Sequence, residues 1–320
     1  MVLVVLLIIG IRGVQGQDFY SAKDYYLHEH TLFPAATGVN YYPVLGLSYN
    51  KQWAGLLDSP NRVVVGLNWR LGKYDFYTPK MLLNKSKRNT KERMGIGLAF
   101  KQDRNGPLLT SNLITSYAYH LPLFWATMSF GMDLSFNEVS INQANLDPND
   151  PNDPYLFSDQ SSENYFQSSF GFQLSNEMFF ASIAARNLFK NEKLNEIGYS
   201  RTAPDYFVYL GYTQSVNKYI KVEPSIFAYG VDQSDYAWEL GAKMYVRSLN
   251  WVSVNYNSIG SVKANFTLHA IYSIQLGYGI EYYLDNIESG SYTGHCIYIG
   301  RNFGVRNMHG IRKNVKQKFL

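Results

Sequence analysis

Histidine, serine and carboxylate side chains are the groups from which a hydrolytic site would be built. Such a site needs a nucleophilic serine beside a histidine base, or paired acids with a histidine. The six histidines are His28, His30, His120, His269, His295 and His309. No segment places any of them beside a serine or an acid in a recognisable catalytic arrangement. We therefore predict that the protein is not an enzyme and has no catalytic residue.

Oxygen ligands gather in the run Asp147-Pro-Asn-Asp-Pro-Asn-Asp-Pro154, which contains Asp147, Asp150 and Asp153. Calcium takes six to eight oxygen ligands, so this run could hold the ion. Its prolines stiffen the backbone, however, and the glycine of tight calcium loops is absent. Asp-Pro and Asn-Pro steps are turn formers. We expect a rigid outer turn, with calcium binding as the alternative, and we predict no cofactor.

The elements that would position these residues are strands with alternating side chains. In the segment 62–71, one face carries Val63, Val65, Leu67, Trp69 and Leu71, and the other carries Arg62, Val64, Gly66, Asn68 and Arg70. A strand collects the apolar set on one face, whereas a helix would scatter it around its axis. The alternation recurs along the chain and predicts fourteen strands. They are expected at 43–52, 61–71, 93–102, 110–121, 123–136, 164–175, 177–187, 205–213, 218–231, 235–248, 250–258, 261–274, 275–285 and 293–303.

Composition and strand length together indicate a membrane barrel. Aromatic residues make up 16% of the chain, which is heavy for a soluble protein, but the mean hydropathy of -0.22 is too polar for a helical membrane protein. Soluble β-sandwiches and propellers also alternate, but their strands rarely exceed about eight residues. We therefore predict an all-β fold, a transmembrane antiparallel up-and-down β-barrel of about 14 strands. The single cysteine, Cys296, excludes an internal disulfide framework and a cysteine-based zinc site.

The N-terminus indicates export. Residues 1–11 are almost wholly apolar, and Val14-Gln15-Gly16 offers small residues suited to signal peptidase. We predict a cleaved signal peptide at 1–16 and a location in the Gram-negative outer membrane. Residues 17–42 would lie in the periplasm or lead into the lumen, residues 43–303 would form the barrel, and 304–320 would be a basic periplasmic tail.

Connection lengths alternate along the predicted barrel. Short turns are expected in the periplasm, and long connections at 53–60, 103–109, 137–163 and 187–204 are expected outside. Gly72–Glu92 breaks this pattern, because it is long and basic yet falls on the periplasmic side. Either it is an insertion facing the periplasm, or the strand count is wrong near it.

Charges of both signs fall on the predicted lumenal faces. They are Arg62, Arg70, Arg93, Lys101, Asp133, Arg186, Lys221, Glu223, Glu239, Lys243, Arg247 and Glu281. Wide porins use sixteen or more strands. Fourteen strands with this many long side chains predict a filled or narrow lumen, in which ion pairs across the lumen would satisfy the charges.

Several motifs occur in a fixed order. Leu32–Gly38 resembles the signature "NPA-x-x-G", and Asn50–Gly55 with Ser59-Pro60 looks like "R-x-Q-W-x-G…P". Further along the chain, Gly95–Leu98 with Asp103–Pro107 is similar to "G-x-G-x…ND-x-x-GP". Ser116–Leu123 then looks like "YAYR-I-PL", and Ala184–Leu188 resembles "S-x-x-NL". Together they make the sequence similar to the PorP/SprF family of the type IX secretion system over nearly the whole mature chain. The sequence departs from the signature at Phe33, where the family usually has Asn.

The resemblance implies a non-enzymatic barrel of Bacteroidetes that supports type IX secretion, in some members for gliding motility. Implied partners are a secreted, adhesin-like surface protein recognised through its C-terminal domain, other type IX secretion components and outer-membrane lipid, but no nucleic acid. The candidate partner-binding residues in the predicted outer loops are Trp53, Asp58, Pro60, Asp103, Asn105, Asp147, Asp150, Asp153 and Asn187. A passive channel or small-solute transporter is the alternative function.

Overall fold

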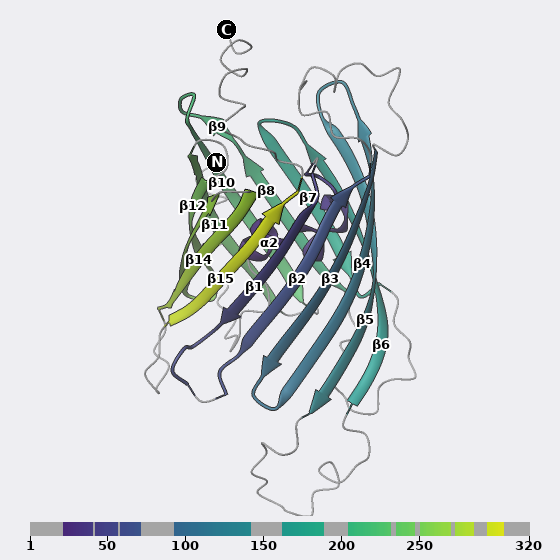
Figure 1. Cartoon of the computed structure of the whole chain (residues 1–320), viewed down its shortest axis with the longest axis vertical. Helices are drawn as coiled ribbons and strands as arrows, with labels where there is room; N and C mark the ends of the chain where they lie inside the picture. The colour runs from purple at the N-terminus through teal and green to yellow at the C-terminus, as the bar shows by residue number, and fades with distance from the viewer. Residues whose placement is uncertain are drawn as a thin grey trace, which may run out of the picture.

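The computed structural model of the chain describes residues 22–40, 42–56, 58–71, 93–141, 162–188, 204–231, 235–246, 250–269, 273–284 and 293–303. These residues form a closed barrel with a short N-terminal segment inside it (Figure 1). The expected signal peptide, the connection Gly72–Glu92, the proline-rich run at 147–154 and the basic tail lie outside the described residues. Among the residues that are described, no helix combines the length and the apolar character needed to cross a bilayer.

All pairings between neighbouring strands are antiparallel. The strands are β1 (Val44–Lys51), β2 (Asn61–Arg70), β3 (Met94–Asn105), β4 (Leu108–Pro122), β5 (Thr127–Ile141), β6 (Ser162–Ser175), β7 (Phe179–Arg186), β8 (Asp205–Tyr212), β9 (Gln214–Ser215), β10 (Ile220–Val231), β11 (Asp235–Val246), β12 (Asn250–Asn257), β13 (Ser261–His269), β14 (Ile274–Tyr283) and β15 (Thr293–Asn302). Only Thr213 separates β8 from β9, and both pair with β10, so they form one arm of the wall. Counted this way, the described residues form fourteen strands, and the predicted barrel fold is confirmed.

The first and last strands close the wall. β1 pairs with β15 from Val44↔Asn302 to Lys51↔His295, and the other arms pair in chain order. β2 pairs directly with β3, so the strand count on either side of Gly72–Glu92 is correct. Closure satisfies the backbone N–H and C=O groups that two free sheet edges would expose, which is the condition for a sheet to span lipid.

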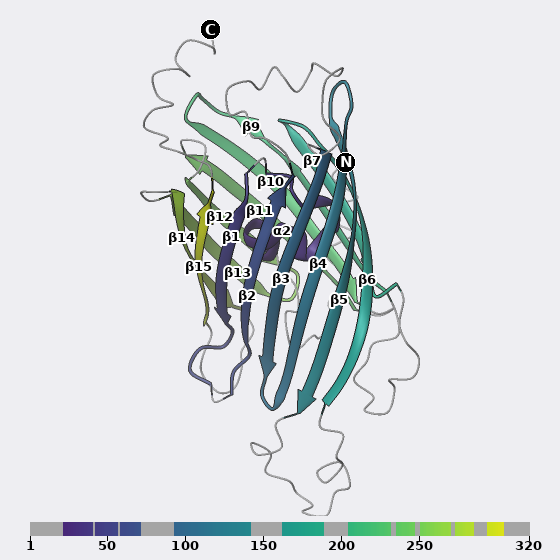
Figure 2. The same ribbon diagram turned by 45° about the vertical axis from the view of Figure 1, so that its right-hand side comes forward.

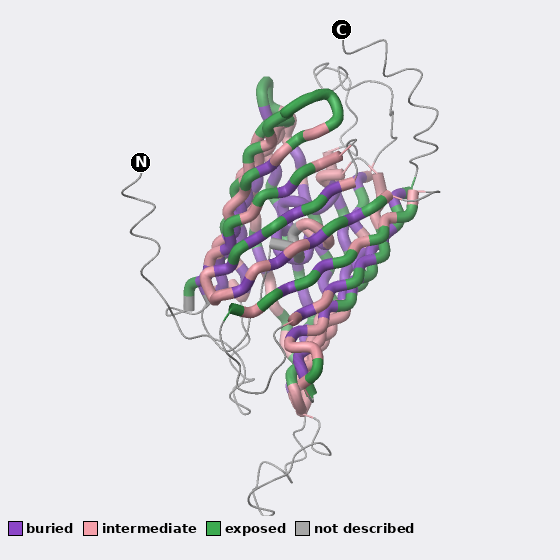
Figure 3. Tube along the Cα trace, turned by 90° about the vertical axis from the view of Figure 1, so that its left-hand side faces the viewer, coloured by how far each residue is buried: buried purple, intermediate pink, exposed green. Residues whose placement is uncertain are grey.

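Burial alternates from residue to residue along the strands (Figure 3). The exposed residues of the wall are mostly apolar, and most of the buried ones are polar. In β1, Leu45, Leu47 and Tyr49 are each more than two-fifths exposed, whereas Ser48 and Asn50 are buried. This arrangement is the reverse of a soluble protein and matches a barrel whose outer band faces acyl chains.

The two ends of the barrel differ. We call the end where β1 begins and β15 ends the base, and the opposite end the mouth; the base is uppermost in Figure 1. The wall is uneven at the mouth, because β4 and β5 have 15 residues each while β7 and β8 have 8. Figure 2 shows β3 to β6 as the tall side.

One predicted outer loop is shorter than expected. The β3–β4 connection contains only Gly106 and Pro107, so Asp103 and Asn105 belong to β3 rather than to a loop at 103–109. Gly106 has φ +57° and permits the tight turn. The strand pattern was missed here because polar residues occupy both faces of the hairpin beyond the lipid-facing band.

The described N-terminal residues lie inside the barrel. α2 (Ala22–Leu32) contains a kink at His28, and the short 3-10 helix η1 (Pro34–Ala36) follows it. The wall surrounds α2 in two views of the molecule (Figures 1 and 2). We call residues 22–40 the plug. Of the two positions expected for 17–42, these residues occupy the lumen.

Candidate functional site

Glycines on the lumenal side of the wall admit the plug backbone. At Gly95 in β3, a Cβ atom would overlap the Thr37 carbonyl, and at Gly131 in β5 it would overlap the Pro34–Ala35 peptide. At Gly171 in β6, it would lie 3.1 Å from the backbone nitrogen of Ala35. We call Gly95, Gly131 and Gly171 the glycine seat, because their missing side chains create the space that the plug occupies.

Gly38 completes the close approach of the plug to the wall. Its φ of +72° lies in the left-handed region that favours glycine, and a Cβ there would lie 2.7 Å from Gly95 Cα. Its N–H donates to Asn68 Oδ1 over 2.5 Å, and its carbonyl accepts from Arg70 Nη1 over 3.1 Å. These contacts explain why the Leu32–Gly38 motif ends on glycine.

The other side of the plug packs against aromatic rings of the wall. The Phe33 ring is fully buried, and its centroid lies 6.4 Å from those of Phe207, Tyr209 and Phe227. We call these three rings, which come from β8 and β10, the aromatic wall. Full burial of a phenylalanine side chain stabilises by about 1.5–3 kcal/mol. The unusual Phe33 of the motif therefore fits its surroundings in this barrel.

His120 joins the base of β4 to the plug. Its Nε2 lies 2.8 Å from the Thr37 carbonyl oxygen, and its Nδ1 lies 2.7 Å from Ser129 Oγ. A carbonyl can only accept, so Nε2 donates, and in a neutral ring Nδ1 then accepts from the serine hydroxyl. His120 thus links β4 and β5 to the plug through two hydrogen bonds.

Burial shifts the titration of three plug side chains. It lowers the pKa of His28 to about 3 and that of His30 to about 4, so both rings are neutral at pH 7. It raises the pKa of Glu29 to about 7, even though Lys243 and the Asn68 amide favour the charged carboxylate. Glu29 Oε1 accepts from Asn68 Nδ2 over 3.0 Å and from Asn40 Nδ2 over 2.9 Å.

A cavity of about 320 Å³ lies between the plug and the base. We call it the base chamber. The Lys243 ammonium lies in it among three aromatic rings, 4.3 Å from the Tyr26 centroid, 4.6 Å from Trp251 and 4.7 Å from Tyr245. Cation–π contacts of this kind hold the plug residue Tyr26 against the wall.

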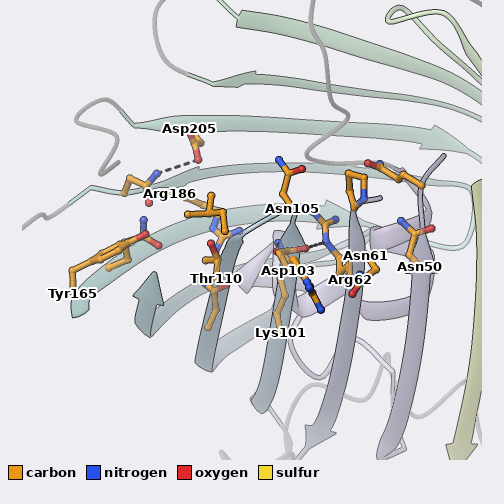
Figure 4. A pocket seen from close by; sticks show the side chains of 17 residues that line it. Asn50, Asn61, Arg62, Lys101, Asp103, Asn105, Thr110, Tyr165, Arg186 and Asp205 are labelled. Carbon is orange, nitrogen blue, oxygen red and sulfur yellow. Dashed lines mark hydrogen bonds and ion pairs between the residues drawn. The ribbon is translucent and has the colours of Figure 1, made fainter. Parts of the chain in front are cut away.

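A second cavity, of about 240 Å³, lies at the mouth. We call it the mouth chamber, and Figure 4 shows the side chains that line it. Asp103 pairs with the Nε of Arg62 and, over 3.0 Å, with the Nζ of Lys101. Asn187 Nδ2 donates to Asp205 over 3.0 Å. None of the described residues lines both chambers, which lie on opposite sides of the plug.

Most of the predicted lumenal charges that are described are buried or half-buried on the inner face. They are Arg62, Arg70, Lys101, Asp133, Arg186, Glu223, Glu239, Lys243 and Glu281. Lys221, near the base end of β10, is exposed. Arg93 lies at the base with a buried Nε, and Arg247 lies outside the described residues.

One set of lumenal ion pairs runs along the wall rather than across the lumen, which differs from our expectation. Lys263 Nζ lies 3.1 Å from Glu239 and 3.5 Å from Glu281. Lys263 was not among the predicted charges, although it stands directly opposite Glu281 in the β13–β14 register.

Part of the predicted outer-loop set lies around the mouth chamber. Pro60, Asp103, Asn105 and Asn187 line it. Asp58 lies beside it, 3.6 Å from the guanidinium of Arg104. The Trp53 ring packs on Tyr283 at 6.0 Å. Asp147, Asp150 and Asp153 lie outside the described residues, and the residues that are described contain no group of three or more possible metal ligands.

Comparison with protein families identifies the chain. The model of the type IX secretion system membrane protein PorP/SprF matches residues 14–300. The chain belongs to the PorP/SprF family. The resemblance carried by the ordered motifs is therefore confirmed. The family and the barrel fold are those of an outer-membrane secretion protein, not those of enzymes. No curated protein matches the chain.

Solved outer-membrane proteins resemble the chain at low sequence identity. The toluene transporter TodX of P. putida is 8% identical, with 89% of this chain and 95% of that chain covered and a TM-score of 0.49. The toluene transporter TbuX of Ralstonia pickettii is 10% identical, with 85% and 92% covered and a TM-score of 0.46. Omp33 of Acinetobacter baumannii is 6% identical, with 83% and 100% covered and a TM-score of 0.47. These likenesses are too distant to carry a functional argument.

Proposed function

We propose that the protein is a non-enzymatic docking barrel of type IX secretion, which supports secretion or surface anchoring of a partner protein through that partner's C-terminal domain. Family membership supports the secretion role. The plug is the observation that carries the docking role, because its fit into the glycine seat fills the lumen at mid-height. A barrel filled in this way offers surfaces at its two ends rather than a wide aqueous path.

The mouth is the end that we assign to the partner. Its tall side, β3 to β6, stands beside the low rim of β7 and β8, so a partner would meet an uneven surface. The half-exposed Asp58–Arg104 pair and the Trp53–Tyr283 ring contact also lie at the mouth, in the β1–β2 connection and at the ends of β3 and β14. Arginine and aromatic side chains are enriched in protein interfaces, and here Arg104 and Trp53 would contact the partner's C-terminal domain.

Co-isolation from native membranes tests the proposal. Tagged full-length protein is extracted in detergent, and the proteins that accompany it are identified by mass spectrometry. We expect a secreted surface protein with a type IX C-terminal domain, displaced by an excess of that domain alone. Repeated recovery of the barrel without such a protein would contradict the proposal.

Site-directed crosslinking tests the assignment to the mouth. In a Cys296→Ser background, cysteine replaces Asp58 at the mouth or the exposed Lys218 at the base. We expect a crosslinker to join the partner to the Asp58→Cys protein and not to the Lys218→Cys protein. The opposite pattern would move the docking surface to the base.

Conductance separates docking from the alternative of a passive channel. The wild-type protein, inserted into planar bilayers, is expected to give no steady current, because the plug occupies the lumen. A steady open-channel current in the wild type would favour small-solute passage instead.

A further inference from the structure

We propose that the mouth chamber binds one ring-sized unit of an uncharged saccharide. The chamber opens at the mouth and shares Arg104 with the proposed docking surface, but most of its lining residues lie on the inner faces of the strands. The chamber has the composition of a site for a ligand dense in hydroxyl groups, and three of its properties point to this class.

Carboxamides dominate the chamber. Seven of its seventeen described lining residues are asparagine or glutamine, including Asn50, Asn112 and Gln167. Pro60 and Leu108 are the only aliphatic side chains among these lining residues. Most small-molecule pockets are mainly apolar with a few polar groups. A carboxamide both donates and accepts hydrogen bonds, as a sugar hydroxyl does, so this lining matches a polyhydroxylated ligand.

Each charge that lines the chamber has a partner in the chamber or next to it. Arg104 lies 3.6 Å from Asp58, and the Arg186 guanidinium interacts with the Asp133 carboxylate. Asp103 faces both Arg62 and Lys101, and Asp205 accepts from Asn187. An anionic or cationic ligand would have to displace these internal pairs. An uncharged ligand can instead accept from the cations and donate to the carboxylates while leaving the pairs intact.

The wall is fixed before a ligand arrives. Asn137 in β5 accepts from the amide of Asn112 in β4, and its own amide donates to Gln167 Oε1 over 3.2 Å in β6. The same amide reaches the Tyr165 carbonyl at 3.4 Å. This network links three strands, so binding orders few side chains and loses little conformational entropy.

The volume of the chamber and one aromatic side chain in its lining limit the ligands that it can bind. The cavity of about 240 Å³ is smaller than the range for drug-sized ligands, about 300–1,000 Å³. It therefore has room for one ring rather than for a folded element of a protein. Tyr165 lies on one side of the chamber and Asn50 on the opposite side (Figure 4). A tyrosine ring is a side chain that can pack against the C–H groups of a pyranose.

An extended peptide is the main competing ligand, because its backbone also donates and accepts. Peptide recognition adds pockets for side chains or pairing with a sheet edge. The chamber offers almost no apolar pocket, so the lining favours the saccharide.

Saturation-transfer NMR with the full-length protein tests the proposal. The protein is kept in a zwitterionic detergent, because a maltoside head group would itself compete. Maltotriose, cellotriose, mannotriose and triacetylchitotriose are titrated, with a Gly-Ser peptide and citrate as comparisons. We expect saturable binding of at least one trisaccharide and none of the peptide or citrate. The polysaccharide released from lipopolysaccharide is titrated in parallel to separate a surface glycan from a free sugar, and binding of either supports the proposal.

Variants locate the binding. Asn112→Ala and the near-isosteric Thr110→Val alter the chamber, whereas Asn265→Ala removes a lumenal carboxamide that does not line it. We expect at least tenfold weaker saccharide binding in the first two and unchanged binding in the third, with all three folded by heat-modified gel migration. Absence of trisaccharide binding, equal binding in all variants, or peptide binding in its place would overturn the proposal. Partner co-isolation should be unaffected by Thr110→Val, so failure of this site and failure of protein docking are distinguishable.

Discussion

The plug meets two kinds of wall. On the side of β3, β5 and β6, the contact is backbone against backbone, across the glycine seat. On the side of β8 and β10, it is ring against ring, between Phe33 and the aromatic wall. The glycine side has no side chain that can move aside, so it fixes the position of the plug. The aromatic side buries apolar area, so it supplies most of the hydrophobic stabilisation.

Adding a methyl group to the glycine seat should have the largest effect. In Gly131→Ala, the Cβ overlaps the Pro34–Ala35 peptide, and the plug has to leave its position. We expect a cost above about 3 kcal/mol, the upper end of ordinary overpacking. Steady ion current in planar bilayers is the readout.

Gly294→Ala is the matched control for this substitution. Gly294 is also buried in the wall, but its nearest neighbours at 3.3 Å are Lys51 and Tyr283 rather than the plug. This variant should stay silent in planar bilayers. A silent Gly131→Ala barrel that migrates as folded would contradict the role of the seat.

Truncating Phe33 should have the next largest effect. Phe33→Ala leaves a cavity among Phe207, Tyr209 and Phe227 and should cost about 3–5 kcal/mol. The plug should still occupy the lumen most of the time but leave it transiently more often. Chymotrypsin should therefore cleave within residues 22–40 faster than in the wild type. Phe33→Leu, which keeps most of the apolar volume, should show a smaller increase. Equal cleavage in all three proteins would mean that the aromatic side contributes little.

Removing the ammonium of Lys243 should have a moderate effect. Lys243→Met keeps the length of the side chain but loses its contacts with the rings of Tyr26, Tyr245 and Trp251. A partly buried cation–π contact contributes about 0.5–2 kcal/mol. Faster chymotrypsin cleavage of the plug, by about a factor of ten, is expected. An unchanged cleavage rate would mean that the aromatic wall and the glycine seat hold the plug without help from Lys243.

Mild acid should loosen the plug by the smallest amount. The pKa values of His28 and His30 are lower in the folded state, about 3 and 4, than the ordinary 6.5, so their contribution is lost as pH falls from 6.5 toward 4. Glu29 acts in the opposite sense, because its raised pKa of about 7 makes its contribution largest below 4.5. The two histidines outweigh the one acid, and plug cleavage should rise between pH 6.5 and 5. In His28→Gln, the rate of plug cleavage should change less with pH. An unchanged pH dependence would mean that other groups cause it.

The barrel wall could be predicted from the sequence, because the alternation of residue types that produces each strand is visible within a few neighbouring residues. Each strand repeats an alternation with period two, as in Leu45, Leu47 and Tyr49 of β1, and this suffices to set both the faces and the count of fourteen among the described residues. At Asp103 and Asn105 the pattern predicts a loop, because neither face of the strand carries apolar residues there.

The plug could not be placed from the sequence, because its contacts are distant along the chain. Thr37 meets His120, and Tyr26 meets Ser225, 83 and 199 residues away. The family motif at Leu32–Gly38 drew attention to the segment but gave no information about its surroundings. The ion pair of Lys263 with Glu281 could not be predicted either, because it depends on the register between β13 and β14. The mouth chamber combines side chains of seven strands, which no local pattern brings together.

The seam between β1 and β15 has a consequence for biogenesis. The plug precedes β1 in the chain, and its backbone fits glycines that lie inside a wall already hydrogen-bonded all round. Threading a kinked helix into a finished cylinder against this fit would be slow. We expect the N-terminal segment to settle on β2–β6 while the sheet is still open, so that joining the last strand to the first encloses it. The machinery that inserts the barrel would then deliver a protein whose lumen is filled from the moment it forms.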